Sequence, residues 1–339
     1  MNRRLRKNSC ALLLLVLASS ASIASANDTA VPQHIPDAYA QAAKLVTIGQ
    51  GRQLNLRCSG SGTHTVLLEA GSHADSMSWF RVQPLLAPLS RVCAYDRAGY
   101  GFSSEGPLPR NLDADVTDLH ALIASAKIDT PLILVGHSLG SNIARRYAER
   151  YPADVDGMVL LDPPAQDIAA FAPAWAKDDD KLNVQRFAFI RQCETAARTG
   201  ALASPPPELK SCLARANPLA GAKLNAQIVA NKSKPAYWRS LLSELQDNAE
   251  VFNQPVPAHE THGSIPLLVL TASNTYADAP ADVRRLLEAA RDKTQAQIVA
   301  SSSRGERQFV ADSSHDIELD QPDVVAHAVT KVLQQTASH

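Results

Sequence analysis

The chain has 339 residues, with 33 lysines and arginines against 34 aspartates and glutamates, and a formal net charge of −1. This balance argues against a nucleic-acid partner, because such partners select strongly basic surfaces. Hydrophobic residues make up 45% of the chain, which is ordinary for a globular enzyme, and the length suits one large α/β domain with an insertion.

The first 26 residues have the pattern of a secretory signal peptide. Four basic residues precede the apolar run 11–18, and Ala24-Ser25-Ala26 forms an A-x-A cleavage site. The run is too short to span a bilayer, although an uncleaved N-terminal anchor is the alternative. Cleavage near Ala26 would leave 29 basic against 34 acidic residues and predicts a periplasmic or secreted protein. No later segment is apolar enough to span a membrane.

Four cysteines remain after such cleavage, and an even number in an oxidising compartment predicts disulfides. Three pairings are possible. Cys193 and Cys212 flank a polar, proline-rich loop at 204–208 and are expected to close it, which leaves Cys58 with Cys93. The alternative is four buried free thiols.

The chain then alternates between predicted strands and helices after a polar, proline-containing lead-in at 27–43. Apolar runs predict strands at 44–48, 53–58, 65–69, 91–95, from Leu132 onward, and at 155–161, 265–271 and 308–311. Helical spacing of apolar residues predicts helices at 76–86, 112–126, 142–148, 282–293 and 323–333. Such alternation predicts a mostly parallel, doubly wound sheet with helices on both faces.

The alternation stops between Pro163 and Ser264. Aromatic and aliphatic residues in this stretch fall on predicted helices, so we expect a helical cap inserted after the sixth strand. The predicted organisation is a core of 27–162 and 265–339 with a cap of 163–264.

The most informative residues are 132–140, Leu-Ile-Leu-Val-Gly-His-Ser-Leu-Gly, which contain G-x-S-x-G centred on Ser138. An apolar strand precedes the serine and a helical pattern follows it. Such a strand-to-helix turn holds a serine hydroxyl clear of the sheet, at a helix N-terminus that favours an anion. Ser138 is therefore the candidate nucleophile.

A serine hydroxyl needs a base within hydrogen-bond reach and an acid that orients the base. With this elbow the base comes late in the chain, and His315 fits because it follows the predicted strand 308–311 on a loop. His137 lies inside the elbow and is expected to point elsewhere. His315 is the candidate base.

The orienting acid has more than one candidate. Its usual place is the loop after strand 265–271, where Thr275 stands instead of an aspartate and Asp278 follows. Asp162 ends strand 155–161, at the sheet edge where sites assemble, and its Leu-Asp-Pro context is similar to the one that carries the acid in pancreatic-type lipases. We favour Asp162, with Asp278 as the alternative. Other carboxylates, Asp167 and Asp316, stay open.

An oxyanion hole needs donors that are already in place. One is expected to be the backbone N–H of Leu139, directly after the nucleophile. The other is expected from the loop after strand 65–69, where Ala70-Gly71 precedes Ser72, whose N–H is the candidate second donor.

Four motifs in order resemble the α/β-hydrolase family over about residues 44–333. They are Ala70-Gly71 with Trp79 downstream, the D-R-x-G-x-G-x-S turn at 96–103, the elbow at Ser138, and the His315 loop. The resemblance implies the α/β-hydrolase fold, with a turn at 96–103 that shapes the loop beside the pocket. It also implies that the second and fourth strands are neighbours, which supports a Cys58–Cys93 bridge.

Two departures from the family pattern matter: the missing aspartate after strand 265–271, and Ser141 in place of a second glycine. Neither a dinucleotide fingerprint nor a zinc motif occurs, since His259-Glu260-Thr261-His262 is one residue short of H-E-x-x-H. We therefore expect neither a cofactor nor a metal.

The predicted function is carboxylesterase-like cleavage of a small-molecule ester through an acyl-enzyme. The same residues would serve another acyl hydrolase or an acyltransferase acting on a lactone, thioester or amide. A non-catalytic binding module is a third reading, against which the intact serine and histidine weigh. The sequence does not give the oligomeric state.

Overall fold

The computed structural model describes residues 31–213 and 215–336. The predicted signal peptide, residues 1–26, and its cleavage site lie outside the described residues. None of the helices in the described ranges combines the length and the apolar character that crossing a bilayer requires.

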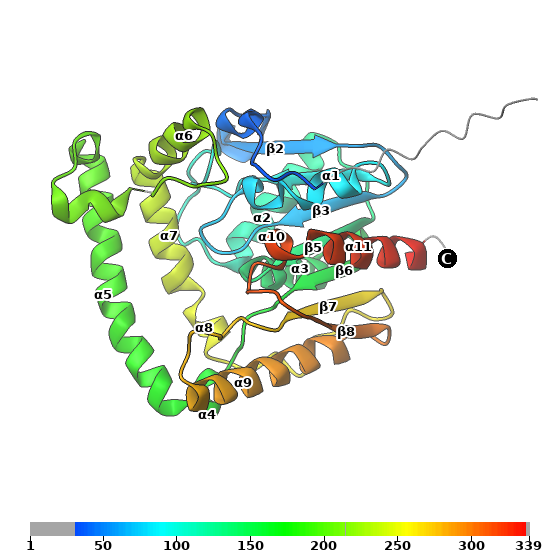
Figure 1. Ribbon diagram of the computed structural model, residues 1–339. Helices are drawn as coiled ribbons and strands as arrows, with labels where there is room; N and C mark the ends of the chain where they lie inside the picture. The colour runs from blue at the N-terminus through cyan, green and yellow to red at the C-terminus, as the bar shows by residue number, and fades with distance from the viewer. Residues whose placement is uncertain (1–30, 214, 337–339) are drawn as a thin grey trace, which may run out of the picture.

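Eight strands form one sheet in the order β1-β2-β4-β3-β5-β6-β7-β8 (Figure 1). β1 and β2 are antiparallel to each other, and β2 is antiparallel to β4, whereas all other neighbours are parallel. The carboxyl ends of the parallel strands therefore meet at one edge. The strands are β1 (Lys44–Thr47), β2 (Gln53–Ser59), β3 (Thr65–Glu69), β4 (Arg91–Tyr95), β5 (Leu132–His137), β6 (Val155–Leu161), β7 (Leu267–Ala272) and β8 (Gly305–Val310).

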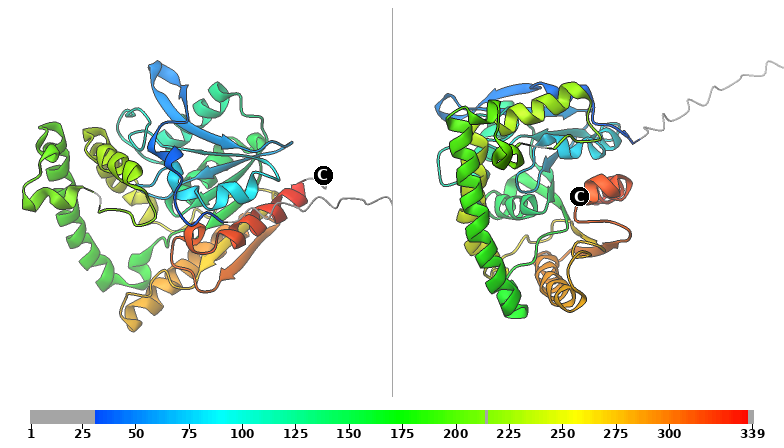
Figure 2. Two further views of the ribbon diagram at one scale, coloured as in Figure 1. Left: turned by 45° about the horizontal axis from the view of Figure 1, so that its top comes forward. Right: turned by 60° about the vertical axis from the view of Figure 1, so that its left-hand side comes forward.

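Helices cover both faces of the sheet, as Figure 2 shows in two orientations. Side chains of α2, α3 and α9 pack on one face, and side chains of α1 and α11 pack on the other. Successive strand residues alternate between these two cores, since neighbouring side chains of a strand point to opposite faces. These helices are α1 (Val82–Leu86), α2 (Leu112–Ala126), α3 (Leu139–Arg150), α9 (Ala281–Ala300) and α11 (Pro322–Thr336), and the short α10 (Ile317–Asp320) precedes α11.

Among the described residues, five α-helices lie between β6 and β7 in the chain. Two of them, α5 and α7, pack together in a separate hydrophobic cluster around Ile190 and Trp238. Tyr100, from the loop after β4, joins this cluster and so ties it to the sheet domain. In Figure 1 these helices stand beside the carboxyl edge of the sheet, with α5 outermost. They are α4 (Ile168–Phe171), α5 (Pro173–Arg198), α6 (Ala222–Lys232), α7 (Pro235–Asp247) and α8 (Ala249–Phe252).

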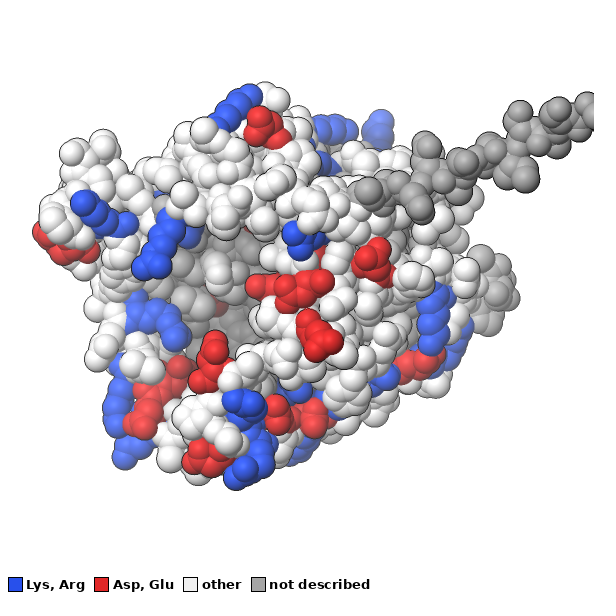
Figure 3. Space-filling view, viewed as in Figure 1, with Lys and Arg blue, Asp and Glu red and all other residues white. Residues whose placement is uncertain are grey.

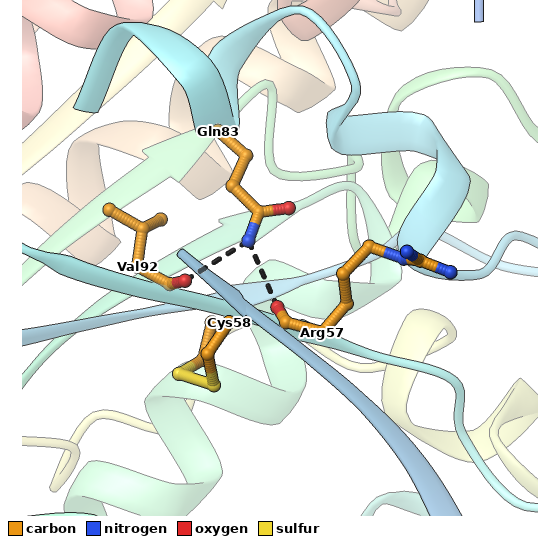
Figure 4. The surroundings of a disulfide bond; sticks show 5 residues. Arg57, Cys58, Gln83 and Val92 are labelled. Carbon is orange, nitrogen blue, oxygen red and sulfur yellow. Dashed lines mark hydrogen bonds between the residues drawn. A yellow bond between two sulfur atoms is a disulfide. The ribbon is translucent and has the colours of Figure 1, made fainter. Parts of the chain in front are cut away.

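Two disulfides are present, with the expected pairings Cys58–Cys93 and Cys193–Cys212. The first joins residues that face each other across β2 and β4. Gln83 of α1 clamps the same strand pair, because its amide nitrogen donates to the carbonyl oxygens of Arg57 at 2.9 Å and Val92 at 3.0 Å (Figure 4). The second disulfide ties the end of α5 to the loop that follows it.

The predicted elements differ from the observed ones mainly at their ends. The predicted helix 76–86 begins instead as a 3₁₀ turn, Ser76–Trp79, before α1. The backbone stays helical through Phe80 and Arg81, but the first turn closes with i to i+3 hydrogen bonds, including Phe80 N–H to Met77 O. The predicted helix 282–293 extends to Ala300 in α9, and the predicted strand 308–311 already begins at Gly305 in β8.

Candidate active site

Ser138 lies at the turn between β5 and α3, in a strained backbone conformation with φ 51° and ψ −121°. Its N–H donates to the carbonyl oxygen of Leu161 at 3.0 Å. A Cβ on Gly136 would lie 2.4 Å from the Gly140 carbonyl oxygen, and a Cβ on Gly140 would lie 2.4 Å from the Glu69 carbonyl oxygen. The two glycines of G-x-S-x-G therefore permit the close approach that places the serine at the end of the strand.

The N–H of Leu139 is the first of helix α3, which has 12 residues. Helix N-termini carry partial positive charge, so this N–H is suited to stabilise an anion. Within the described ranges, neither this N–H nor that of Ser72 has a hydrogen-bond acceptor in the protein. Both groups are thus available as donors.

His315 and Asp162 are joined by a hydrogen bond between His315 Nδ1 and Asp162 Oδ2, 2.8 Å long. Asp162 is buried at the end of β6, with a left-handed φ of 41°, while the His315 side chain is 34% exposed. A carboxylate accepts, so Nδ1 carries the proton and Nε2 is left as the basic nitrogen. The pair has the arrangement of an oriented general base.

Three further donors surround the Asp162 carboxylate. Thr275 Oγ1 donates at 2.5 Å, and the Ala272 N–H and Gln295 Nε2 donate at 3.3 Å each. Arg291 Nη1 lies 3.7 Å from Oδ1. Burial alone would raise the pKa of Asp162, but the hydrogen bond from His315 and the charge of Arg291 help to hold it below its usual range. The carboxylate therefore stays charged at neutral pH.

The structure brings Asp162, and none of the other three candidate acids, to the His315 ring. Asp278 is exposed and has no contact with His315 among the described residues. Asp167 precedes α4, and Asp316 lies 3.8 Å from the His137 ring. Thr275, which stands where the family's acid was expected, donates to Asp162.

Ser138 and His315 line two separate pockets, and Pro164 lies in the wall of both. No hydrogen bond joins their two described side chains. Catalytic hydrogen bonds often tighten only when a substrate is bound. The ring of His137, the residue before Ser138, has its centroid 4.7 Å from that of His315.

His137 supports the His315 loop, a role that the sequence did not reveal. Its Nε2 lies 3.0 Å from the carbonyl oxygen of His315, and its Nδ1 lies 3.2 Å from Glu318 Oε1. Burial and the neighbouring His315 lower the pKa of His137 to about 3, and burial raises the pKa of Glu318 well above its usual range. Both shifts favour the uncharged forms of these two side chains, which lie in contact in the interior.

Within the described part of the chain, His137, Asp316 and Glu318 also form a group whose ligand atoms lie close enough together to hold a metal ion, within 4.8 Å of one another. Both ring nitrogens of His137 already have protein partners. The sequence 259–262 has a structural role, because Glu260 forms a two-fold salt bridge with Arg145 and lies 3.2 Å from His262.

The loop after β3 is held by a buried charge cluster. Ser72 Oγ donates to Glu244 Oε1 at 2.5 Å, and Arg97 donates to the carbonyl oxygens of Ala70 and Gly71 at 2.6 Å and 2.7 Å. Glu244 comes from α7, one of the inserted helices. Sequence reasoning missed it, because nothing in its local sequence signals a contact with residue 72.

A cavity of about 830 Å³ opens beside Ser138. In Figure 3 this face of the molecule is hollowed between the regions where Figure 1 draws α7 and α10. The apolar part of the cavity wall comes mostly from the inserted helices, and α5 adds charged groups to it. The lining residues include Ser72, Ser138, Leu139, Ile168, Trp175, Asp179, Asp180, Arg186, Phe187, Glu244, Leu245 and Phe252.

Known proteins resemble this chain in sequence and in fold. The sequence model of the alpha/beta hydrolase family matches residues 59–328. The uncharacterized protein YqjL of Bacillus subtilis is 36% identical over 115 residues, which are 33% of this chain and 44% of that protein. The N-formylmaleamate deformylase of Pseudomonas putida is 34% identical over 114 residues, 33% of this chain and 42% of that protein. The chain thus spans less than half the length of these curated relatives.

Among solved structures, that of a thermophilic esterase from Thermogutta terrifontis superposes with a TM-score of 0.57 at 19% identity. The match covers 87% of this chain and 99% of the esterase. At this identity the likeness concerns the fold.

Proposed function

This chain belongs to the alpha/beta hydrolase family, and we propose that it is a serine hydrolase that cleaves an ester through an acyl-enzyme on Ser138. The observation that carries the proposal is the 2.8 Å hydrogen bond between His315 and the buried Asp162, in a chain that also holds a serine on a strained elbow. This is the set of groups that converts a serine hydroxyl into a nucleophile.

In the proposed reaction, His315 Nε2 removes the proton of Ser138 as Oγ attacks the carbonyl carbon of the ester. The tetrahedral oxyanion accepts hydrogen bonds from the N–H groups of Leu139 and Ser72. His315 then gives the proton to the departing alcohol, and the acyl-enzyme forms. A water molecule, activated by the same nitrogen, releases the acid and restores Ser138. Asp162 stays charged throughout and stabilises the imidazolium form of His315.

The proposed substrate is a small ester with an apolar group. Apolar side chains from four inserted helices, among them Trp175, Phe187 and Phe252, line the cavity beside Ser138, and binding pockets of this kind accept apolar groups. A series of p-nitrophenyl esters of increasing acyl length tests this. We expect kcat/KM to rise beyond acetate, and activity confined to acetate would contradict an apolar pocket.

A second candidate is an amidase-type hydrolysis at the same serine. The similarity to a deformylase, 34% identical over 114 residues, favours it over the other acyl transfers. Matched ester and anilide substrates with one acyl group separate the two: a larger kcat/KM on the anilide would replace the ester proposal.

The test of the catalytic role is Ser138→Ala. Removing the nucleophile is expected to reduce ester turnover to the background of the folded protein, and turnover that survives would refute an acyl-enzyme on Ser138.

Location in the periplasm or outside the cell is also proposed, with the two disulfides as support. N-terminal sequencing of the exported protein, expected to begin near Asn27, tests it.

A further inference from the structure

Glu244 is a carboxylate on α7 that reaches the loop after β3. Its side chain is 2% exposed, so it lies away from bulk water and needs partners that compensate its charge. Those partners are residues of the loop itself together with Arg97. An inserted helix thus makes a buried polar contact with the loop that carries the candidate oxyanion donor.

Both oxygens of Glu244 are used. Oε1 accepts from Ser72 Oγ at 2.5 Å and from the N–H of His73 at 3.0 Å. Oε2 accepts from Arg97 Nη2 at 3.0 Å. The hydroxyl of Ser72 is therefore anchored on Glu244, while the backbone N–H of Ser72 has no acceptor among the described residues and stays free to donate.

Arg97 binds the carbonyl oxygen of the peptide group that joins Gly71 to Ser72. Its Nη2, the nitrogen that contacts Glu244, also donates to the carbonyl oxygen of Gly71 at 2.7 Å. That carbonyl and the Ser72 N–H belong to one planar, trans peptide group and point in opposite directions. Fixing the carbonyl therefore fixes the direction of the N–H, and a cation on the oxygen also polarises the N–H as a donor.

The charge of Arg97 is shared with a second acid. Arg97 Nη1 donates to Glu69 Oε1 at 2.8 Å and to the Ala70 carbonyl oxygen at 2.6 Å. Arg97 keeps its charge, since the nearby carboxylates, Glu244 first, raise its pKa against the effect of burial. A single guanidinium thus joins the end of β3, the loop and α7.

We propose that Glu244 is a positioning residue for the oxyanion hole, which acts with Arg97 to set the orientation of the Gly71–Ser72 peptide. The proposal rests on the proposed function, because it assigns the Ser72 N–H to the tetrahedral oxyanion. If so, catalysis requires the contact between α7 and the loop after β3, and α7 does more than line the cavity.

The test compares Glu244→Ala and Glu244→Gln with Glu250→Gln as the matched control. Glu250 lies on the neighbouring α8, is exposed, and lies outside this cluster. In Glu244→Ala we expect kcat, per serine titrated with a fluorophosphonate, to fall by about 10- to 100-fold with KM within about threefold, since a small misplacement of catalytic groups has such effects. Glu244→Gln keeps an acceptor for Ser72 and should fall less, and Glu250→Gln should match the wild type.

Two readouts separate positioning from mere stability. A boronic acid, which mimics the tetrahedral intermediate, should lose affinity for Glu244→Ala by the factor that kcat/KM loses. Amide hydrogen exchange of residues 71–75 should also accelerate in that variant and not in Glu250→Gln. A wild-type kcat per titrated serine in Glu244→Ala, or unchanged boronate affinity, would overturn the proposal even if thermal stability drops. Absence of a fluorophosphonate adduct in the wild type would instead refute the proposed function, and the positioning role with it.

Discussion

Replacing Asp162 by asparagine should disable the enzyme without unfolding it. Both carboxylate oxygens of Asp162 face donors: Oδ2 faces His315 Nδ1 and Thr275 Oγ1, and Oδ1 faces the Ala272 N–H and Gln295. An asparagine has one acceptor oxygen and one NH₂ group. In either orientation of the amide, an N–H of the new side chain meets a donor.

The consequence for catalysis follows from the orientation that keeps the most contacts. If the amide oxygen faces Ala272 and Gln295, the NH₂ group faces His315 Nδ1 and favours the tautomer with its proton on Nε2. The base is then blocked, and loss of this kind costs about 10³- to 10⁴-fold in kcat. That is about 4–5.5 kcal/mol of activation free energy.

The assay is kcat/KM on a p-nitrophenyl ester for Asp162→Asn and for Asp278→Asn, each shown to be folded by circular dichroism and thermal unfolding. Asp278 is exposed and serves as the matched control, with activity expected within about twofold of the wild type because exposed substitutions of this kind perturb little. Asp162→Asn with more than a tenth of wild-type activity, or a large loss in Asp278→Asn, would refute the assignment of the acid.

Three more predictions concern stability and the elbow. His137 has a pKa of about 3 in the folded protein against 6.5 for a free histidine, so between these pH values the unfolded chain binds one more proton and the unfolding free energy falls as the pH drops. In urea unfolding between pH 6.5 and 3, the unfolding free energy of His137→Gln should therefore depend less steeply on pH than that of the wild type, by about 1.4 kcal/mol per pH unit. Parallel curves for the two proteins would contradict this. Replacing both Cys193 and Cys212 by serine opens a loop with a sequence separation of 19 and should lower the unfolding free energy by about 3 kcal/mol, whereas an unchanged urea midpoint would argue against a constraint on the unfolded chain. Gly140→Ala puts a Cβ 2.4 Å from the Glu69 carbonyl oxygen and should cost about 1–3 kcal/mol of stability together with most of the ester activity, so a fully active, stable variant would show that the elbow tolerates a side chain.

Much of this architecture follows from short-range patterns. The apolar runs at β3, β5 and β7 are buried along their whole length, and such runs identify inner parallel strands. The G-x-S-x-G elbow was recognisable because its glycines stand at fixed positions around the serine, where a side chain would collide with backbone atoms of the turn or of the end of β3. Asp162 was identifiable as an acid at the end of a strand, where parallel sheets gather their polar groups.

Contacts between distant segments were not predictable in the same way. Glu244 is separated by 172 positions from Ser72, and Gln295 by 133 positions from Asp162. Each is a single polar residue on a helix whose pattern indicates only that the helix is amphipathic or exposed. Its partner depends on how the inserted helices and α9 seat on the sheet, which is decided by tertiary packing. Thr275 was visible only as a missing aspartate, and its hydroxyl proves to donate to Asp162 at the end of β6.

The central claim, a nucleophilic Ser138 activated by His315, is tested most directly by mass mapping of the folded protein after treatment with a fluorophosphonate. The account predicts one adduct, on the peptide that contains Ser138, with no adduct in Ser138→Ala and a strongly slowed reaction in His315→Ala. Folded wild-type protein that carries no adduct, or carries it on another serine, would contradict the account.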